Sequence, residues 1–173
     1  LMRKVSSLFF DISKSAEDQN KTEMYKQQYQ RKIAQNNSNN IEDYLSSLEL
    51  KMKVFVDDEK FISRMAQMTQ KTNQFNLTTI RYTEADLSRF VLDENFRVIC
   101  ISVADKFGDS GITGLCIVKL NRLQKSALID TLLISCRVIG RNIEFAFVNK
   151  VIKILKQEGI INIQATYQKT IKN

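Results

Sequence analysis

The sequence predicts a mixed α/β fold in which antiparallel strands lead into a parallel β-α-β unit. Three runs rich in Val, Ile and Leu read as buried strands, at residues 96–103, 112–120 and 127–134. Residues 121–125 are polar and short enough for a hairpin turn, so the second and third runs are expected to pair antiparallel. Residues 105–111 hold two glycines and are expected to form a loop.

The parallel part is predicted by the last third of the chain. Ile143, Phe147 and Val151 begin a wide apolar stripe at helical spacing over residues 142–158, and Gly159 is suited to end that helix. Residues 160–167 read as the next strand. A right-handed crossover through the helix would place this strand parallel to the strand at 127–134.

The first half of the chain predicts mainly helices. Met24, Tyr25, Tyr29 and Ile33 form a sparse apolar stripe, so the first helix is expected to dock by one thin edge. Helices are expected at residues 15–35, 41–50, 58–71 and 83–92, with an Asn-rich loop at 36–40 and a strand at 51–56.

The length and the net charge of the chain limit the classes of protein to which it can belong. The 173 residues suffice for one domain with a real core. No apolar run approaches the length of a membrane-spanning helix, so no membrane association is expected. The net charge of +7 suits acidic or phosphate-bearing partners, although solubilising Lys on helix faces explains it equally well. Aromatic residues do not interleave with the basic ones, which argues against a nucleic-acid surface.

Histidine is absent and cysteine is sparse. The sequence therefore excludes a His general base, Ser–His and Cys–His dyads, and nearly all zinc sites, and no metal is expected. Cys100, Cys116 and Cys136 are odd in number and widely spaced, which favours a reducing, cytoplasmic setting over a disulfide framework. Cys100 and Cys116 fall within strands and are expected in the core.

The stretch 126–144 predicts an anion site. A buried strand ends in a turn that holds Arg137, Gly140 and Arg141, and a long helix begins directly after it. The start of a helix offers unpaired N–H groups and the positive end of its dipole. The N–H groups of residues 138–142 and the two arginines are therefore expected to hold a phosphate or diphosphate, with Gly140 permitting close approach.

Cys136 lies in the same turn and is a candidate nucleophile. Positive charge and a helix N-terminus favour the thiolate form of a cysteine. We hypothesise that Cys136 accepts an acyl group as a thioester and passes it to a second thiol, an exchange that requires no His. The alternative is a small buried cysteine at a tight turn.

Two further polar features are candidates for a substrate pocket. Residues 69–79 are dense in amides and hydroxyls, which suit hydrogen bonds to an irregular backbone and also the wall of a pocket for a polar acyl chain; the structural role is favoured. Asp130 lies mid-strand among Ile and Leu, where a lone carboxylate is costly. Pairing with Arg81 or Arg97 is expected, and orientation of a substrate hydroxyl is the alternative.

Asp105 and Asp109 flank Gly108 in the predicted loop. Aspartate commonly caps turns through hydrogen bonds to the backbone two residues on. Turn capping therefore explains these two residues as well as a role in binding does.

The turn resembles the signature of a known fold. A strand, then Arg-x-x-Gly-x-Gly or Ala, then a helix is the acyl-CoA-binding signature of the GNAT-type acyltransferases, and residues 137–142 read RVIGRN. Asn142 stands where that pattern has a small residue. The resemblance implies acyl-CoA or a phosphopantetheine-linked acyl group as substrate, with no covalently bound cofactor. The residues it assigns to the acyl donor are Arg137, Val138, Ile139, Gly140, Arg141 and Asn142.

Three longer blocks resemble the FkbH-like family. They are TQKTNQFNLTT at 69–79 with RYTE at 81–84, DKFGDSG at 105–111, and IDTLLISCRVIGR at 129–141. The ending at 167–173 is similar to the family's Tyr-x-Pro-Thr-x-Lys-Asn, with Lys169 in place of Pro. The resemblance covers about residues 15–173.

The resemblance implies a multidomain parent. Members of the family couple an N-terminal HAD-type phosphatase domain to a C-terminal GNAT-like part, and are associated with glyceryl transfer from a phosphoglycerate donor to an acyl carrier protein in polyketide biosynthesis. The phosphatase motif Asp-x-Asp-x-Thr is absent here, so that activity is not expected in this piece. Residues 1–14 would be the tail of the HAD-type domain, 15–57 a helical linker, and 58–173 a GNAT-like domain truncated at its C-terminus.

The resemblance thus implies transfer of a glyceryl-type acyl group to the phosphopantetheine thiol of an acyl carrier protein, through a thioester on Cys136. The expected partners are that carrier protein and the HAD-type domain of the parent chain. One alternative is a GNAT enzyme that acylates an amine from acyl-CoA, and another is a non-catalytic module that only docks the carrier. The expected substrate-pocket residues are Thr72, Asn73, Gln74, Asn76, Arg81, Asp109 and Asp130.

Overall fold

The computed structural model describes residues 16–169, so the expected domain tail at residues 1–14 and the last residues of the 167–173 motif lie outside the described residues. The elements in chain order are α1 (Ala16–Asn36), α2 (Ile41–Ser47), β1 (Lys51–Val56), the 3-10 helix η1 (Glu59–Phe61), α3 (Ile62–Lys71), α4 (Glu84–Leu92), β2 (Phe96–Asp105), β3 (Gly108–Asn121), β4 (Ser126–Ile134), α5 (Ile143–Gln157) and β5 (Asn162–Ala165).

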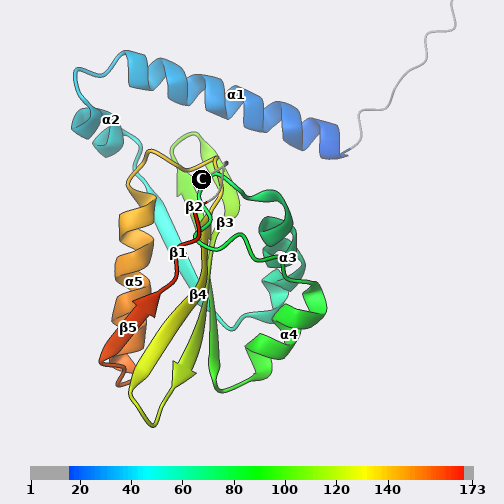
Figure 1. Ribbon diagram of the computed structural model, residues 1–173. Coiled ribbons are helices and arrows are strands. Elements are labelled where there is room, and N and C mark those ends of the chain that lie inside the picture. Colours follow the sequence, from blue (N-terminus) through cyan, green and yellow to red (C-terminus); the bar gives the residue numbers. More distant parts are fainter. Residues whose placement is uncertain (1–15, 170–173) are drawn as a thin grey trace, which may run out of the picture.

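The strands of the described chain form one sheet in the order β1-β2-β3-β4-β5 (Figure 1). The pairs from β1 to β4 are antiparallel, and β5 lies parallel to β4. The predicted mixed sheet, the hairpin between β3 and β4, and the parallel strand after α5 are therefore confirmed. β1, which the sequence analysis grouped with the helical linker, pairs with β2 as an edge strand of this sheet.

Helices cover both faces of the sheet, with α5 on one face and α3 and α4 on the other (Figure 1). Because successive residues of a strand point to opposite faces, the central strand β3 supplies both cores. Cys116 packs in the core under α5, whereas Leu115 and Ile117 pack in the core under α3 and α4. Cys100 and Cys116 are both buried, which confirms their expected place in the core.

The predicted loop at 105–111 is a tight hairpin instead, because β2 extends to Asp105 and β3 begins at Gly108. Asp105 Oδ1 accepts hydrogen bonds from the N–H groups of Phe107 and Gly108, at 3.0 and 3.2 Å. Asp105 therefore caps the turn, which is one of the two roles that the sequence left open for it. Gly108 lies against α1, since the end of the Gln27 side chain is the group that a Cβ at this position would meet.

Helix α1 crosses one end of the sheet (Figure 1), and the prediction of its docking edge was wrong. Tyr25, Tyr29 and Ile33 are 77%, 68% and 43% exposed. The helix turns Arg31 inward, leaving that side chain only 5% exposed and ion-paired with Asp105. A buried ion pair therefore sets the rotation of this helix, and of the four stripe residues only Met24 is half-buried while the other three are left in solvent.

The edge of β4 beyond Ile129 is closed by a segment from elsewhere in the chain. β5 pairs with β4 only from Ser126 to Ile129. Past that point, Leu77 N–H donates to the Leu132 carbonyl and Ile134 N–H donates to the Phe75 carbonyl, both at 3.0 Å. Residues 75–78 thus occupy the edge where β4 and β5 separate.

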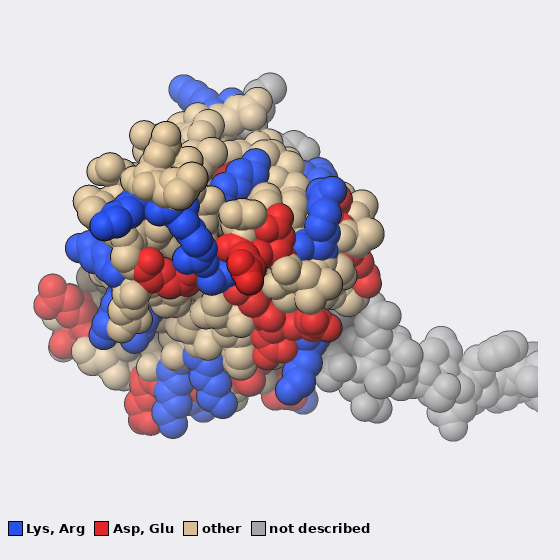
Figure 2. Space-filling model, turned by 90° about the horizontal axis from the view of Figure 1, so that it is seen from below, with Lys and Arg blue, Asp and Glu red and all other residues tan. Residues whose placement is uncertain are grey.

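Charges of both signs mix on the face seen in Figure 2, at the end of the sheet that carries the β3–β4 hairpin. The net charge of +7 does not collect into a single basic patch on that face. None of the helices within residues 16–169 combines the length and the hydropathy that crossing a bilayer requires.

Candidate functional site

The candidate site is the turn between β4 and α5. β4 ends at Ile134, and the chain then folds back so that Val138 N–H donates to the Ser135 carbonyl at 3.1 Å. Val138 is fully buried and anchors the turn in the core below α5. Ile139 also packs against that core, so these two side chains fix the backbone while Cys136 and Arg137 remain exposed.

Two residues of the turn adopt left-handed backbone. Gly140 has φ 80° and Asn142 has φ 58°. Asparagine tolerates this conformation better than most side chains, which accounts for its presence where the GNAT signature has a small residue. No heavy atom lies within 4 Å of the position of a Gly140 Cβ, so the space beside this glycine is open.

The backbone N–H groups of the turn only partly match the predicted anion cradle. Val138 N–H is already engaged by Ser135. Within residues 16–169, the N–H groups of 139–142 make no hydrogen bond to the chain, and α5 begins at Ile143. Gly140 and Asn142 are exposed, so their N–H groups remain available to an acceptor, whereas Arg141 is buried. Glu144, in the first turn of α5, has a buried carboxylate oxygen without a partner in the described chain, which opposes binding of a negative charge directly at the helix start.

Cys136 and Arg137 stand between two cavities. The α3-side cavity has a volume of 380 Å³, and its walls are Arg64, Gln67, Met68, Lys71, Thr72, Asn73, Gln74, Ser135, Cys136 and Arg137. The α1-side cavity has a volume of 510 Å³, and its walls are Met24, Tyr25, Gln27, Gln28, Arg31, Asp109, Ser110, Cys136 and Arg137. A ligand in either cavity would therefore lie close to Cys136.

A buried ion cluster lies beside the α1-side cavity. Arg31 donates to both carboxylate oxygens of Asp105, at 2.7 and 2.9 Å, and Arg141 Nη1 donates to Asp105 Oδ2 at 3.0 Å. Arg141 Nη2 also donates to the Arg137 carbonyl at 2.6 Å. Arg141 is therefore held by the protein itself, at 6% side-chain exposure, and does not reach outward as the anion-site prediction required.

The carboxylate of Asp105 is held ionised by this cluster. Burial raises the pKa of Asp105, but the Arg31 hydrogen bonds, the Phe107 N–H and the charges of Arg31 and Arg141 outweigh it, so the pKa lies below its usual value. Burial and the nearby charge of Arg31 lower the pKa of the Arg141 guanidinium. Two cations share one carboxylate, so the cluster keeps a net positive charge.

The α3-side cavity has the opposite character. Within residues 16–169, no carboxylate forms an ion pair with Arg64, Lys71 or Arg137, and none lines the cavity. Burial lowers the pKa of the Arg64 guanidinium, and the positive charge of Arg137 lowers it further. The two arginines therefore repel each other across a cavity that offers them no counter-charge.

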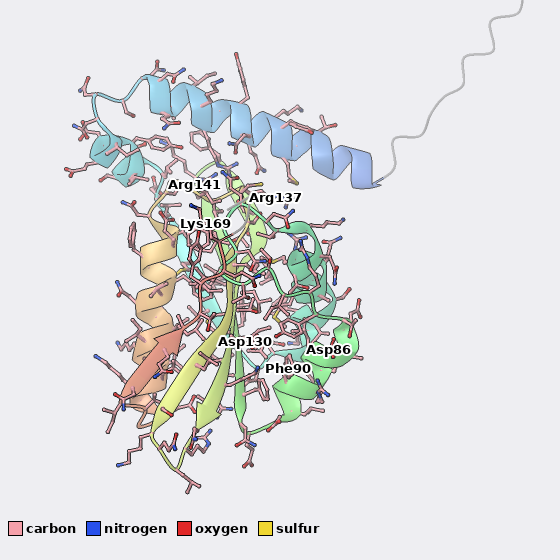
Figure 3. The ribbon with its side chains drawn as sticks, in the orientation of Figure 1. Asp86, Phe90, Asp130, Arg137, Arg141 and Lys169 are labelled. Atoms are coloured by element: carbon pink, nitrogen blue, oxygen red, sulfur yellow. The ribbon has the colours of Figure 1, made fainter. Side chains whose placement is uncertain are left out.

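Asp130 belongs to a separate network midway along the sheet, whereas Arg137 lies at the sheet's end (Figure 3). Its oxygens accept from Lys119 Nζ at 2.7 Å and from the Tyr82 hydroxyl at 2.5 Å. The prediction that Asp130 is paired is confirmed, but the predicted partner was wrong. Arg97 pairs with Asp57 and Glu158, and Arg81 donates to the Thr69 carbonyl and to Asn73.

The carboxylate of Asp130 is ionised within this network. Burial raises the pKa of Asp130, but hydrogen bonds from Lys119 and Tyr82 and the charge of Lys119 lower it below its usual value overall. Burial, together with the hydrogen bond to Asp130, raises the pKa of the Tyr82 phenol. Tyr82 therefore remains a neutral hydrogen-bond donor.

Residues of the polar stretch 69–79 divide between holding the backbone, the structural role that was favoured, and lining a cavity. Asn76 holds the backbone, since its Oδ1 accepts from the N–H groups of Thr78 and Thr79 and its Nδ2 donates to the Thr72 carbonyl. Thr72, Asn73 and Gln74 instead line the α3-side cavity. Asp109 lines the other cavity, and its Oδ1 also accepts from Gly111 N–H.

Sequence reasoning missed the contribution of α3 to the site. Arg64, Gln67 and Lys71 follow one another at spacings of three and four, which places them on one face of the helix. Met65 and Met68 occupy the buried face. The spacing was a usable signal in the sequence, because it predicts that these three polar side chains share one face of the helix expected at 58–71.

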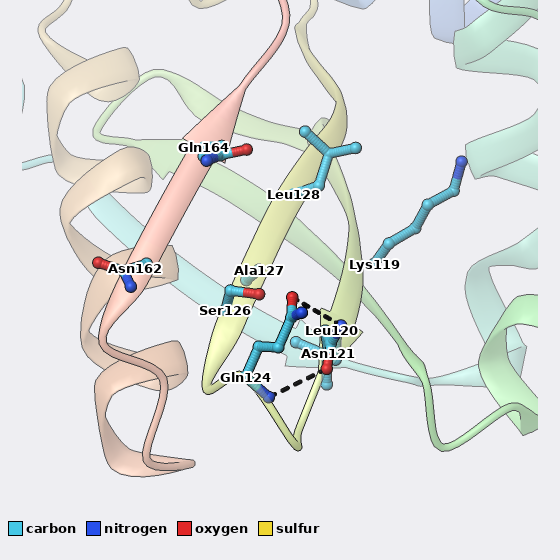
Figure 4. Close-up of a pocket in the computed structure, with 9 residues that line it drawn as sticks. All are labelled: Lys119, Leu120, Asn121, Gln124, Ser126, Ala127, Leu128, Asn162 and Gln164. Carbon is cyan, nitrogen blue, oxygen red and sulfur yellow. Dashed lines mark hydrogen bonds between the residues drawn. The ribbon is translucent and has the colours of Figure 1, made fainter.

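A third cavity of 500 Å³ lies at the β3–β4 hairpin and β5, away from Cys136 (Figure 4). Its walls include the amides of Asn121, Gln124, Asn162 and Gln164. Asn121 Nδ2 donates to Gln124 Oε1 at 3.0 Å, which ties two of these amides together. None of the predicted site residues lines this cavity.

No protein-family profile matches the chain, and no curated protein matches it. Several solved structures, however, are similar to the chain. The ribosomal-protein-alanine N-acetyltransferase of Brucella melitensis biovar Abortus 2308 superposes with a TM-score of 0.54 at 9% identity, over 70% of this chain and 84% of that one. A GNAT family acetyltransferase of Staphylococcus aureus gives 0.51 at 10% identity, over 70% and 89%.

The ribosomal-protein-S18-alanine N-acetyltransferase of Escherichia coli gives a TM-score of 0.50 at 8% identity, over 66% of each chain. This chain therefore spans just under two thirds of that enzyme's length. At identities of 8–10%, such likeness reports architecture only. Together these similarities show that this chain has the fold of the GNAT acetyltransferases.

Proposed function

We propose that this chain is an acyltransferase whose reacting centre is Cys136. The observation that carries the proposal is the position of this thiol: it is exposed, it follows β4 in a fold that GNAT acetyltransferases share, and cavities open on both sides of it. Cys100 and Cys116 do not compete with it, because burial raises the pKa of the Cys100 thiol to about 12 and raises the pKa of Cys116 as well.

The step assigned to Cys136 is a thioester exchange. The Cys136 thiolate attacks the carbonyl carbon of an acyl thioester, a C–Sγ bond forms, and the donor leaves as a thiolate that takes up a proton. A second thiolate then attacks the Cys136 thioester and releases Cys136. The N–H groups of the exposed residues Gly140 and Asn142 support this assignment as donors for a pantetheine-linked phosphate.

The acceptor we propose is the phosphopantetheine thiol of an acyl carrier protein, and the group transferred is of the glyceryl type. Support for this finer proposal is the resemblance of residues 69–84, 105–111 and 129–141 to the FkbH-like family. Lys and Arg side chains near the turn would meet the acidic carrier, and a HAD-type domain of the parent chain would be a further partner.

A second candidate is N-acylation of an amine from acyl-CoA. The observation in its favour is that two of the similar structures are described as ribosomal-protein-alanine N-acetyltransferases. That reaction does not use a cysteine nucleophile. The third candidate is a non-catalytic module that only docks the carrier protein. Residues 75–78 favour this candidate, because they already pair with the part of the β4 edge that an extended ligand would otherwise bind.

Intact-mass measurement separates these candidates. The chain is incubated with glyceryl-pantetheine thioester, with and without carrier protein, as wild type, Cys136→Ser and the matched thiol control Cys100→Ala. We expect a glyceryl adduct on wild type and on Cys100→Ala that moves to the carrier, and no adduct on Cys136→Ser. An adduct that persists in Cys136→Ser contradicts the nucleophile. Turnover of acetyl-CoA onto an amine by Cys136→Ser supports N-acylation, and carrier binding without any adduct supports the docking module.

A further inference from the structure

The α3-side cavity gathers positive charge without a counter-charge. Arg64 and Lys71 come from α3, and Arg137 comes from the turn after β4. None of the three has an ion pair in the described chain, although Arg64 is half-buried. Partly buried cations are stabilised when a counter-ion lies between them, so the arrangement favours an anionic ligand.

Two amides in the cavity wall are already turned to act as donors. Arg64 donates to Gln67 Oε1, and Arg81 donates to Asn73 Oδ1. A guanidinium group has donors only, so each amide must direct its oxygen toward the arginine. The Gln67 Nε2 and Asn73 Nδ2 hydrogens are then left for a ligand that accepts.

The ligand that fits this wall is an acceptor with more than one negative charge. One arginine can bind a carboxylate in a bidentate manner, but three cations and two amide donors exceed what a single carboxylate uses. A phosphate monoester carries a charge of about −1.5 to −2 near pH 7 and presents three terminal oxygens. The cavity volume of 380 Å³ leaves room for more of the ligand than its phosphate.

We propose that Arg64, Lys71 and Arg137 form a binding site for the phosphate of a phosphate ester, with the Gln67 and Asn73 amides as further donors. This site lies on the α3 side of the turn and is distinct from the backbone N–H groups of residues 139–142. The inference rests on the proposed function in one respect only: the other end of the ligand would reach Cys136, which lines the same cavity.

Isothermal titration of the whole chain with methyl phosphate tests the site. Wild type is expected to bind it, and Arg64→Gln and Arg137→Gln each to weaken binding about tenfold or more, as loss of a charge-assisted hydrogen bond implies. Lys150→Gln, on the exposed side of α5, removes the same charge and should keep wild-type affinity. Equal affinity of wild type and the Arg64→Gln/Arg137→Gln double variant overturns the proposal.

Two further probes identify the source of the phosphate. If 4′-phosphopantetheine binds wild type at least as tightly as methyl phosphate, binds the Arg64→Gln/Arg137→Gln double variant more weakly, and pantetheine does not bind, the phosphate belongs to the pantetheine arm and lies in the α3-side cavity. If methyl phosphate binds and 4′-phosphopantetheine does not, the ligand is a small phosphate ester. Equal binding of pantetheine and 4′-phosphopantetheine shows that the phosphate is not recognised, and the proposal fails.

Alkylation of Cys136 gives a readout that does not depend on a variant. At constant ionic strength, methyl phosphate is expected to slow labelling of Cys136 by iodoacetamide relative to chloride, because a bound anion in the cavity that Cys136 lines disfavours the reactive thiolate. An unchanged rate at saturating phosphate contradicts the site. Neither binding nor labelling requires acyl transfer, so a chain that binds phosphate but never forms the glyceryl adduct retains this inference and loses the proposed nucleophile.

Discussion

The two cavities that meet at Cys136 and Arg137 differ in whether a carboxylate neutralises the arginines beside them. Beside the α1-side cavity, Arg31 and Arg141 converge on Asp105, whose side chain is fully buried. In the α3-side cavity, Arg64 faces Arg137 with no carboxylate among the lining residues. The first arrangement is completed by the protein and holds α1, the β2–β3 hairpin and the turn together. The second has no counter-charge among its lining residues, which is the observation on which the proposed phosphate site rests.

The largest expected effect comes from breaking the completed arrangement. Asp105→Asn leaves two guanidinium groups buried without a counter-charge, which should lower the free energy of unfolding by about 3–5 kcal/mol. Urea unfolding followed by circular dichroism measures it. Asp109→Asn is the matched control in the same hairpin and should cost less than about 1 kcal/mol. A similar small loss for both variants would mean that the ion cluster does not stabilise the fold.

The pH dependence of that difference follows from the lowered pKa of Asp105. A carboxyl group whose pKa is lower in the folded state stabilises the fold fully above its unfolded pKa of about 3.9, and the contribution is lost as the pH falls through the folded pKa. The gap in unfolding free energy between wild type and Asp105→Asn should therefore be constant above about pH 5 and should shrink in acid. A gap that widens in acid would contradict a lowered pKa of Asp105 in the folded state.

Arg31→Gln should have a smaller and more local effect. Asp105 keeps Arg141, so we expect a loss of about 2 kcal/mol, concentrated in the docking of α1. Hydrogen exchange should accelerate in residues 22–36 and remain slow in β3. Lys32→Gln changes the neighbouring exposed cation and serves as the control. Uniform acceleration over the whole chain would show that α1 does not detach separately.

The smallest expected effect lies in the α3-side cavity. Arg137→Gln and Lys71→Gln should change the unfolding free energy by less than about 0.5 kcal/mol, because both side chains are exposed and neither has an ion pair in the described chain. Thermal unfolding without ligand measures it. A loss above about 2 kcal/mol in Arg137→Gln would place this residue with the structural arginines and would remove the contrast between the cavities.

The sheet and the helix α5 were predictable because local patterns determine them. Alternation and continuous apolar runs mark β2 to β4, and the Ile143, Phe147 and Val151 spacing marks α5. The rotation of α1 was not predictable in the same way. Its apolar stripe indicated one face, but Arg31 pairs with a carboxylate 74 residues away, and sequence spacing gives no access to such a contact.

The candidate site was predictable in part for the same reason. The turn at 136–142 is contiguous, so its strand, glycine and helix start could be read directly. The cavity beside it needed the face of α3 that carries Arg64 and Lys71 to lie against that turn. Arg141 is a residue that the local pattern misassigned. It belongs to an anion-binding signature, but its guanidinium group is ion-paired with the buried Asp105 and is not free to bind a ligand.

Residues 75–78 have a consequence for how the chain meets other chains. A bare strand edge is a template on which a strand of another molecule can add, and sheets that leave one exposed tend to associate. Here the half of the β4 edge that β5 does not cover is paired with residues 75–78 of the same chain, through hydrogen bonds at Leu132 and Ile134. The other side of this segment is paired as well, since Gln168 N–H donates to the Leu77 carbonyl at 2.7 Å. Self-association along β4 would first have to break these bonds, so the segment protects the sheet against edge-to-edge aggregation.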